Sequence, residues 1–207
     1  MLLAIDAGNT NTVFAVYNGR QKIADWRCKT IAGKTADEYA VWLEPLFTRE
    51  NLKFQDISDV IISSVVPDMN FDLTKLSEHY FHCPAGILGQ NVSNTGLRID
   101  LDRPQDIGAD RIANAVAAKQ KYGEPVIIID FGTATTFDVI GVDGAYKGGA
   151  IAPGVNLSIE ALHNAAAQLP AITLERVDKA IGKSTIEAMQ SGLYWGYVFM
   201  IRGMLSK

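Results

Sequence analysis

Several features are scarce or missing in this chain of 207 residues, and each absence argues against a class of protein. Two cysteines, Cys28 and Cys83, are too few for a disulfide framework, which favours a reduced, cytoplasmic setting. No apolar run approaches the roughly 20 residues that a membrane helix needs, and no secretory signal follows Met1. The net charge of −4 lacks the basic excess of nucleic-acid-binding proteins. We therefore expect no membrane and no nucleic-acid partner.

What is present is the composition of a globular protein. Hydrophobic residues make up 48% of the chain and charged residues 20%, which is enough apolar side chain to bury a normal core. At roughly 100–200 residues per domain, the length allows one large domain or two small ones. This composition and length fit an enzyme or a binding protein for a small molecule best.

The hydrophobic pattern predicts strands that come in groups of three, followed by helices. In the first half we expect strands over residues 2–5, 12–17 and 22–29, a helix capped by Thr35 and Glu38, a strand over 59–67, a helix over 68–81 and a strand over 85–88. In the second half we expect a helix over 109–122, strands over 126–129, 135–142 and 145–151, and helices over 153–167 and 184–205. The order in the second half restarts that of the first.

The repeat is also visible in the residues at two strand ends. Asp6, Gly8 and Thr12 follow the first strand, and residues of the same three types recur 124 positions later, in the segment from Asp130 to Thr136. Two copies of one unit suggest two similar lobes that face each other across a cleft. The alternative is a chance similarity between two strand ends.

These two loops have the chemistry of a phosphate clamp. Glycine lets the backbone approach a ligand closely, and the Asn and Thr residues add amide, hydroxyl and backbone N–H donors. A carboxylate repels phosphate, so the aspartates make sense if a cation lies between them and the phosphates. Neither a Walker P-loop nor a Gly-x-Gly-x-x-Gly fingerprint is present. The pattern predicts phosphoryl transfer, whereas a single such loop is more often a plain turn.

Two further segments carry candidate chemistry. Asp110 and Arg111 open the alanine-rich helix, where an aspartate can accept a hydroxyl proton and an arginine can hold a carboxylate. The alternative for Asp110 is a charge that only complements the helix dipole. The small residues of segment 147–154 would let a ligand or another chain approach the backbone closely. The alternative is that they only form a tight connection between a strand and a helix.

Taken together, six segments resemble those of the type III pantothenate kinases, which belong to the actin/hexokinase-like superfamily of acetate and sugar kinases. They lie in order along the whole chain: residues 6–12, 63–67, 108–111, 130–136, 148–154 and 182–185. The resemblance implies an α/β fold of two duplicated ribonuclease H-like (actin-like ATPase) lobes, with mixed five-stranded-type sheets and flanking helices. The lobes are expected over 1–108 and 109–207, the second being incomplete at its C-terminus.

The resemblance also implies a reaction, in which ATP phosphorylates pantothenate in the first step of coenzyme A biosynthesis. Asp110 is expected to be the general base, Asp6 to lie near Mg²⁺, and Asp130 to bind a monovalent cation, K⁺ or NH₄⁺. The pantothenate site is expected to contain Gly108, Ala109, Asp110, Arg111 and Thr185. ATP is expected to contact Asp6, Ala7, Gly8, Asn9, Thr10, Asn11, Thr12, Val13 and Thr133.

Two departures from the family pattern stand out. Leu101 aligns where many members carry a tyrosine that touches the substrate. The sequence stops at Lys207, whereas the family continues with a strand, a Thr-Gly-Gly-type loop and a closing helix that help to hold adenosine. From the resemblance we therefore expect either a fragment or a chain with a damaged nucleotide pocket.

Two other functions remain open at this point. A sugar or small-acid kinase of the same superfamily would use similar loops, although Arg111 favours a substrate with a carboxylate. A non-catalytic accessory or regulatory protein could have kept the kinase fold. The apolar, aromatic stretch 193–201 predicts, in agreement with the resemblance, a homodimer with the active site near the interface.

Overall fold

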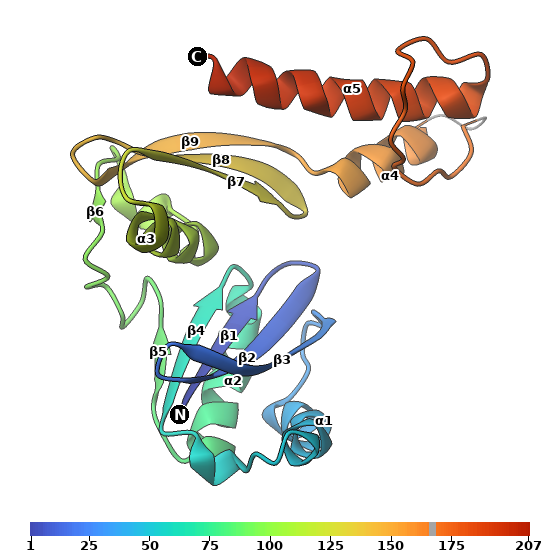
Figure 1. The fold of residues 1–207 in the computed structure, drawn as a ribbon. Coiled ribbons are helices and arrows are strands. Elements are labelled where there is room, and N and C mark those ends of the chain that lie inside the picture. The colour runs from blue at the N-terminus through green and yellow to red at the C-terminus, as the bar shows by residue number, and fades with distance from the viewer. Residues whose placement is uncertain (166–168) are drawn as a thin grey trace. The chain divides into compact units, whose positions relative to one another are not determined.

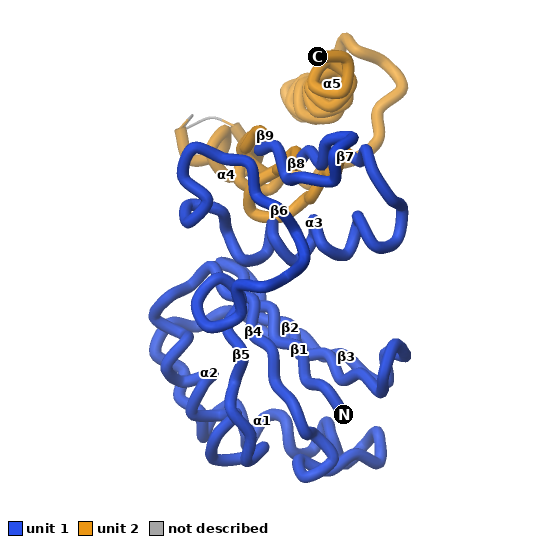
Figure 2. Tube along the Cα trace, turned by 90° about the vertical axis from the view of Figure 1, so that its left-hand side faces the viewer, with its two compact units in different colours: residues 1–126, 139–148 blue, residues 127–138, 149–207 orange. Residues whose placement is uncertain are grey.

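The computed structural model describes residues 1–165 and 169–207, which divide into two compact units. Unit 1 comprises Met1–Val126 and Val139–Gly148, and unit 2 comprises Ile127–Asp138 and Gly149–Lys207 (Figure 2). The α/β class with mixed sheets and flanking helices, predicted from the sequence, is confirmed.

Unit 1 is built on a five-stranded sheet with the order β3-β2-β1-β4-β5 (Figure 1). β1 pairs antiparallel with β2 and parallel with β4, so the sheet is mixed. Its strands are β1 (Leu2–Ala7), β2 (Asn11–Asn18), β3 (Gln21–Lys29), β4 (Asp59–Ser64) and β5 (Ala85–Ile87). The predicted hairpin between β2 and β3 turns at Gly19, which has the positive φ of 59° that such a turn requires.

Strand alternation gives this sheet one apolar face and one mixed face. Ile5, Phe14 and Trp26 lie side by side in register and pack against α1 (Ala36–Arg49) and α2 (Asn70–Leu76). One step along each strand, Asp6 and Arg27 belong to the opposite face. The apolar face therefore forms the core of unit 1, and Asp6 is kept out of it.

The helices of unit 1 follow local signals in the sequence. Helix α1 begins with the predicted capping box, in which the Thr35 hydroxyl accepts from the Glu38 backbone and the Glu38 carboxylate accepts from the Thr35 backbone. Helix α3 (Ala109–Tyr122) has the predicted bounds. The single helix predicted over 68–81 is instead a 3₁₀ turn (Pro67–Met69), α2 and a π-helical turn (Ser77–Phe81).

The second sheet has four strands in the order β6-β9-β8-β7, and the division between the two units runs across it. The strands are β6 (Arg98–Ile99), β7 (Val126–Phe131), β8 (Ala134–Ile140) and β9 (Ala145–Pro153). Three of them were predicted from the sequence, whereas β6 was missed. A network of ion pairs attaches β6 to β9: Lys147 Nζ lies 2.6 Å from Asp100 Oδ2 and 2.9 Å from Asp143 Oδ2, and Arg98 pairs with Asp143.

Unit 2 ends in two helices that follow β9. They are α4 (Val155–Ala165) and α5 (Thr185–Leu205), and the Tyr197 hydroxyl of α5 bonds to Ser158 of α4 and to the Pro153 carbonyl. Of the helix predicted over 153–167, residues 166 and 167 lie outside the described residues. No helix in the described part of the chain is long and apolar enough to cross a membrane.

Candidate active site

The loop between β1 and β2 is tightly closed. The Gly8 N–H donates to the Asn11 carbonyl at 3.0 Å, and a Cβ on Gly8 would lie only 3.2 Å from that oxygen. Asp6, near the end of β1, is exposed, as are Asn9, Thr10 and Asn11, whereas the Ala7 and Thr12 side chains are buried. The loop therefore presents polar groups to solvent on a backbone that the sheet holds in place.

A residue that the sequence analysis missed, Thr30, bonds to this loop from the end of β3. Its hydroxyl donates to the Gly8 carbonyl at 2.6 Å and lies 2.9 Å from the Thr12 hydroxyl. Its backbone N–H donates to the Thr10 carbonyl at 3.0 Å.

The buried Tyr39 contributes to the core beside Thr12. Its ring lies 5.5 Å from that of Phe14 and 4.4 Å from the Lys34 ammonium. Burial raises the pKa of Tyr39 to about 12. The tyrosine is therefore neutral at physiological pH.

Three segments of unit 1 meet at the carboxyl ends of β1 and β4. The Val65 N–H, directly after β4, donates to the Ala7 carbonyl at 3.0 Å. A Cβ on Gly108, the residue that precedes α3, would lie 3.7 Å from the Val65 side chain. Two sequence-predicted segments, the first loop and the Gly108–Arg111 turn, are thus brought to the same edge of the sheet. The carboxyl ends of parallel strands are the usual place for ligands in α/β folds.

The start of α3 holds the two candidate substrate residues in defined positions. Asp110 is half-buried, and its Oδ1 accepts from the Arg111 N–H at 2.8 Å, which leaves Oδ2 for a ligand. A Cβ on the neighbouring Gly108 would lie 2.6 Å from Asp110 Oδ1, so a side chain there would displace the carboxylate. The guanidinium of Arg111 lies 5.9 Å from the centre of the buried Tyr146 ring. A cation–π contact of this kind restricts the arginine side chain.

Unit 2 contains the other loop of the repeat, between β7 and β8. The Gly132 N–H donates to the Ala134 carbonyl at 2.9 Å, and Thr133 is exposed. Asp130 is half-buried on β7. The Gly154 N–H donates to the Thr133 carbonyl at 3.0 Å, and a Cβ on Gly154 would overlap the Gly132 and Thr133 carbonyl oxygens. Because Gly154 has no side chain, the backbone of this loop can pack directly against it.

Thr185 is the first residue of α5 and is exposed. The helix is capped by Ser184, whose hydroxyl accepts from the Glu187 N–H at 3.2 Å. The Glu187 carboxylate in turn accepts from the Lys183 N–H at 2.7 Å. These bonds fix the turn that presents Thr185.

Leu101 lies next to β9 within unit 1. A Cβ on Gly148, which has a φ of 104°, would be 3.3 Å from the Leu101 side chain. The Asp100 and Asp143 carboxylates hold the pKa of Lys147 above its usual value, and so favour the charged pair that anchors this segment. The segment that precedes the Gly108–Arg111 turn is thus attached to the second sheet through charged side chains and a glycine.

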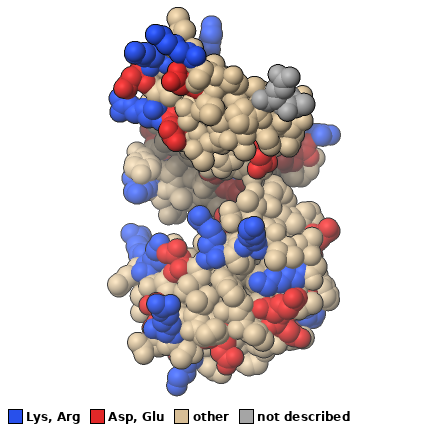
Figure 3. All heavy atoms as spheres, turned by 90° about the vertical axis from the view of Figure 1, so that its right-hand side faces the viewer, with Lys and Arg blue, Asp and Glu red and all other residues tan. Residues whose placement is uncertain are grey.

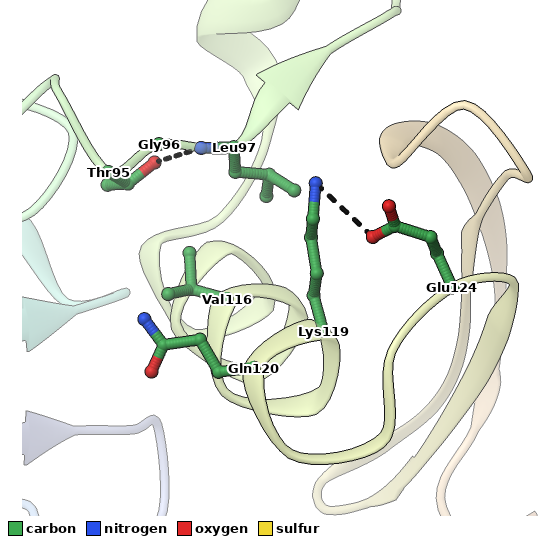
Figure 4. Close-up of a pocket in the computed structure, with 7 residues that line it drawn as sticks. All are labelled: Thr95, Gly96, Leu97, Val116, Lys119, Gln120 and Glu124. Carbon is green, nitrogen blue, oxygen red and sulfur yellow. Dashed lines mark hydrogen bonds and ion pairs between the residues drawn. The ribbon is translucent and has the colours of Figure 1, made fainter.

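A cavity of about 260 Å³ lies beside the C-terminal half of α3. Figure 4 shows Lys119 pointing toward Glu124 across it, with the two charged atoms 3.5 Å apart, and Val116 and Gln120 on the helix side. Asp110 is nine residues earlier on the same helix, a rise of roughly 13 Å. The cavity is therefore separate from the candidate site.

On the face drawn in Figure 3, acidic and basic side chains are interspersed.

Comparisons with known proteins agree with this set of segments. The family model described as type III pantothenate kinase matches residues 2–207. Curated type III pantothenate kinases from Paramagnetospirillum magneticum and Rhodospirillum rubrum are 55% and 56% identical over 207 residues, which cover 100% of this chain and 80% of each relative.

A solved structure also resembles the chain at low sequence identity. It is a Campylobacter jejuni protein assigned to the Baf family of transcriptional activators, with a TM-score of 0.61 and 19% identity over 98% of this chain and 78% of that one. This likeness concerns the fold alone, and the predicted fold class is confirmed. On the strength of the family model and of relatives that match along its whole length, the chain belongs to the type III pantothenate kinase family.

Proposed function

We propose that this chain transfers the γ-phosphoryl group of ATP to the hydroxyl of pantothenate and forms 4'-phosphopantothenate, the first step of coenzyme A biosynthesis. The observation that carries the proposal is that the first loop and the Gly108–Arg111 turn both lie beside Val65, at one sheet edge of unit 1, in a chain of this family. A phosphate-binding loop and a base beside an arginine are the parts that this reaction requires.

The residues at the start of α3 would act on pantothenate. The Asp110 carboxylate accepts the hydroxyl proton through its unbonded Oδ2, while the hydroxyl oxygen attacks the γ-phosphorus and the bond from that phosphorus to ADP breaks. The Arg111 guanidinium pairs with the pantothenate carboxylate. Gly108 and Ala109 complete the part of the pocket that lies in unit 1, and Thr185 of unit 2 is proposed separately as a contact of the substrate.

In unit 1, the first loop would bind the ATP phosphates. Thr133, in unit 2, is proposed separately as a contact of ATP. Residues 6–13 offer backbone N–H and side-chain donors on a closed loop, which suits a phosphate chain. The donor set also fits Mg²⁺ near Asp6, because this ion is commonly held by one or two carboxylates together with substrate phosphates. Within residues 1–165 and 169–207, no group of three or more His, Cys, Asp or Glu side chains is arranged to hold a metal ion.

Asp130 would bind a monovalent cation, K⁺ or NH₄⁺. Its carboxylate is half-buried near the end of β7, where a counter-charge lowers the free-energy cost of keeping it ionised. Such a cation would offset the negative charge of the carboxylate near the nucleotide phosphates.

A homodimer is supported by the surface of α5. Ala188, Gly192, Gly196 and Phe199 follow one another at helical spacing and are exposed, with Phe199 at 60%. Small residues allow a second helix to approach, and the exposed aromatic ring would be buried by a copy of the same chain. We propose that the active site lies near this interface.

The lobes and the compartment belong to the same proposal. The two loops of the repeat support lobes over residues 1–108 and 109–207. The unpaired thiols of Cys28 and Cys83 and the use of ATP support a cytoplasmic location.

The test is phosphorylation of pantothenate with wild-type chain and with Asp110→Asn. This isosteric change should leave the fold intact and reduce turnover by ~10²–10⁴-fold. A panel of hexoses and small hydroxy acids serves as the control for substrate class. Unchanged turnover in Asp110→Asn would refute the assignment of the base, and preference for a hexose would refute the substrate. Binding of pantothenate without turnover would favour an accessory protein.

A further inference from the structure

Thr30 makes two hydrogen bonds to the loop that joins β1 to β2 and a third to Thr12 on β2. Its hydroxyl has a single hydrogen, and the 2.6 Å bond to the Gly8 carbonyl requires it, because a carbonyl only accepts. In the 2.9 Å contact between the two threonine hydroxyls, Thr12 is therefore the donor. With the backbone bond to the Thr10 carbonyl, Thr30 anchors both the start and the middle of the loop.

These bonds connect an exposed loop to a rigid part of the sheet. Asn9, Thr10 and Asn11 are exposed, so apolar packing contributes little to their position. Thr12 is fully buried and is paired in register with Cys28, two residues before Thr30. Thr12 thus donates to Thr30 and Thr30 donates to the Gly8 carbonyl, so the bonds run from the buried sheet to the turn of the loop.

The other half of the repeat supports the same role for this position. Gly154 lies 124 residues after Thr30, the separation that also relates Asp130 to Asp6. Each residue directly follows the third strand of its group, β3 or β9. Each also donates its N–H to a carbonyl of the loop between the first two strands, at 3.0 Å in both cases.

We propose that Thr30 is a positioning residue for phosphoryl transfer. It holds residues 8–11 in the conformation that receives the ATP phosphates, and it does so through the Gly8 and Thr10 carbonyls without touching the nucleotide. This inference rests on the proposed function, in which the loop binds ATP. Rigid placement of donors matters because a displacement of about 1 Å can cost on the order of 10²-fold in rate.

The test is Thr30→Val, which keeps the shape of the side chain and removes its hydroxyl. The variant should raise the KM for ATP by about tenfold or more and leave the KM for pantothenate within about twofold. Hydrogen exchange of the backbone amides in peptides that contain residues 8–11 should become faster. Thr30→Ser, which keeps the hydroxyl, should restore both values.

The matched control is Thr74→Val on α2. Thr74 is also half-buried, and its hydroxyl donates to the Asn70 carbonyl at 2.7 Å, away from the loop. It should change thermal stability at most, and neither the KM for ATP nor loop exchange.

Three results would overturn the inference. They are an unchanged ATP KM with unchanged loop exchange in Thr30→Val, an equal rise in both KM values, and the same kinetic change in Thr74→Val. If Thr30→Val does not fold, Thr30→Ala is judged by the same criteria. A wild-type chain that does not phosphorylate pantothenate refutes the proposed function. Loop exchange in Thr30→Val still tests the anchoring by itself: faster exchange supports it, and unchanged exchange refutes it.

Discussion

Replacing Gly108 by alanine should move the proposed base without disturbing the fold. Gly108 has φ −64° and ψ 143°, which any residue can adopt, so alanine introduces no backbone strain. The new Cβ would lie 2.6 Å from Asp110 Oδ1, whereas ordinary contact begins at 3.4 Å. The Asp110 carboxylate must therefore shift by about 0.8 Å and weaken its bond to the Arg111 N–H.

The magnitude of the kinetic effect follows from this shift. A misplacement of about 1 Å can cost roughly 10²-fold, and a general base contributes ~10²–10⁴-fold in all. We expect kcat/KM to fall by about 10²-fold in Gly108→Ala and by no more than in Asp110→Asn. Stability should change by less than about 1 kcal/mol, because the lower entropy of the unfolded chain offsets the weakened hydrogen bond.

A double-mutant cycle separates this mechanism from a general loss of activity. Coupled measurement of ADP formation gives kcat/KM for Gly108→Ala, Asp110→Asn and the double variant, and circular dichroism gives their melting temperatures. Since both changes act on the same carboxylate, Gly108→Ala should cost less than about threefold in the Asp110→Asn background. If the effects of Gly108→Ala and Asp110→Asn on kcat/KM were fully additive, Asp110 would not be the group that Gly108→Ala displaces. The same would follow if either single variant kept kcat/KM within threefold of wild type.

Three further predictions concern unit 2. Gly154→Ala should destabilise the chain by ~1–3 kcal/mol or more, because the new Cβ would overlap two backbone carbonyls. Gly132→Ala, whose Cβ would make an ordinary 3.5 Å contact, should lower the melting temperature much less. Similar melting temperatures for the two variants would contradict this reasoning. Activity should be low in Na⁺ and restored by K⁺ or NH₄⁺, and Asp130→Ala should lower it in all three; equal wild-type rates would exclude a selective cation site. The wild-type chain should sediment as a dimer at micromolar concentration, and Phe199→Glu should dissociate the dimer or precipitate the protein. A wild-type monomer would refute the dimer. A Phe199→Glu variant that remains a soluble dimer would show that the interface lies elsewhere on the chain.

The elements that the sequence predicted well are those specified by neighbouring residues. Thr35 and Glu38 make a capping box within four residues, and α3 has an alanine-rich body that ends at Gly123. The chain around His82 was predicted less well. A helical pattern continues through Phe81, but the backbone passes through a π-helical turn and then the left-handed region at His82, with φ 57°. Apolar periodicity does not distinguish an α-helix from these variants.

The candidate site shows the same limit. The motifs of the first loop and of the Gly108–Arg111 turn were visible as short segments, and in unit 1 they do come together. β6 was missed because two residues carry no periodic pattern, and it is held by partners such as Asp143 that lie more than forty residues away. Thr30 was missed because its importance comes from strand register and from bonds to a loop about twenty residues earlier.

The equivalence of Thr30 and Gly154 also explains why the repeat is hard to follow in sequence. Both residues donate an N–H to the neighbouring loop at 3.0 Å, so the backbone has the same role in each half. In the first half there is room for a side chain, and its hydroxyl adds a bond to the Gly8 carbonyl. In the second half the Gly132 and Thr133 carbonyls occupy that space, and only glycine fits. Residues of opposite character therefore mark one structural position, and exchanging them would loosen the first loop and force the second apart.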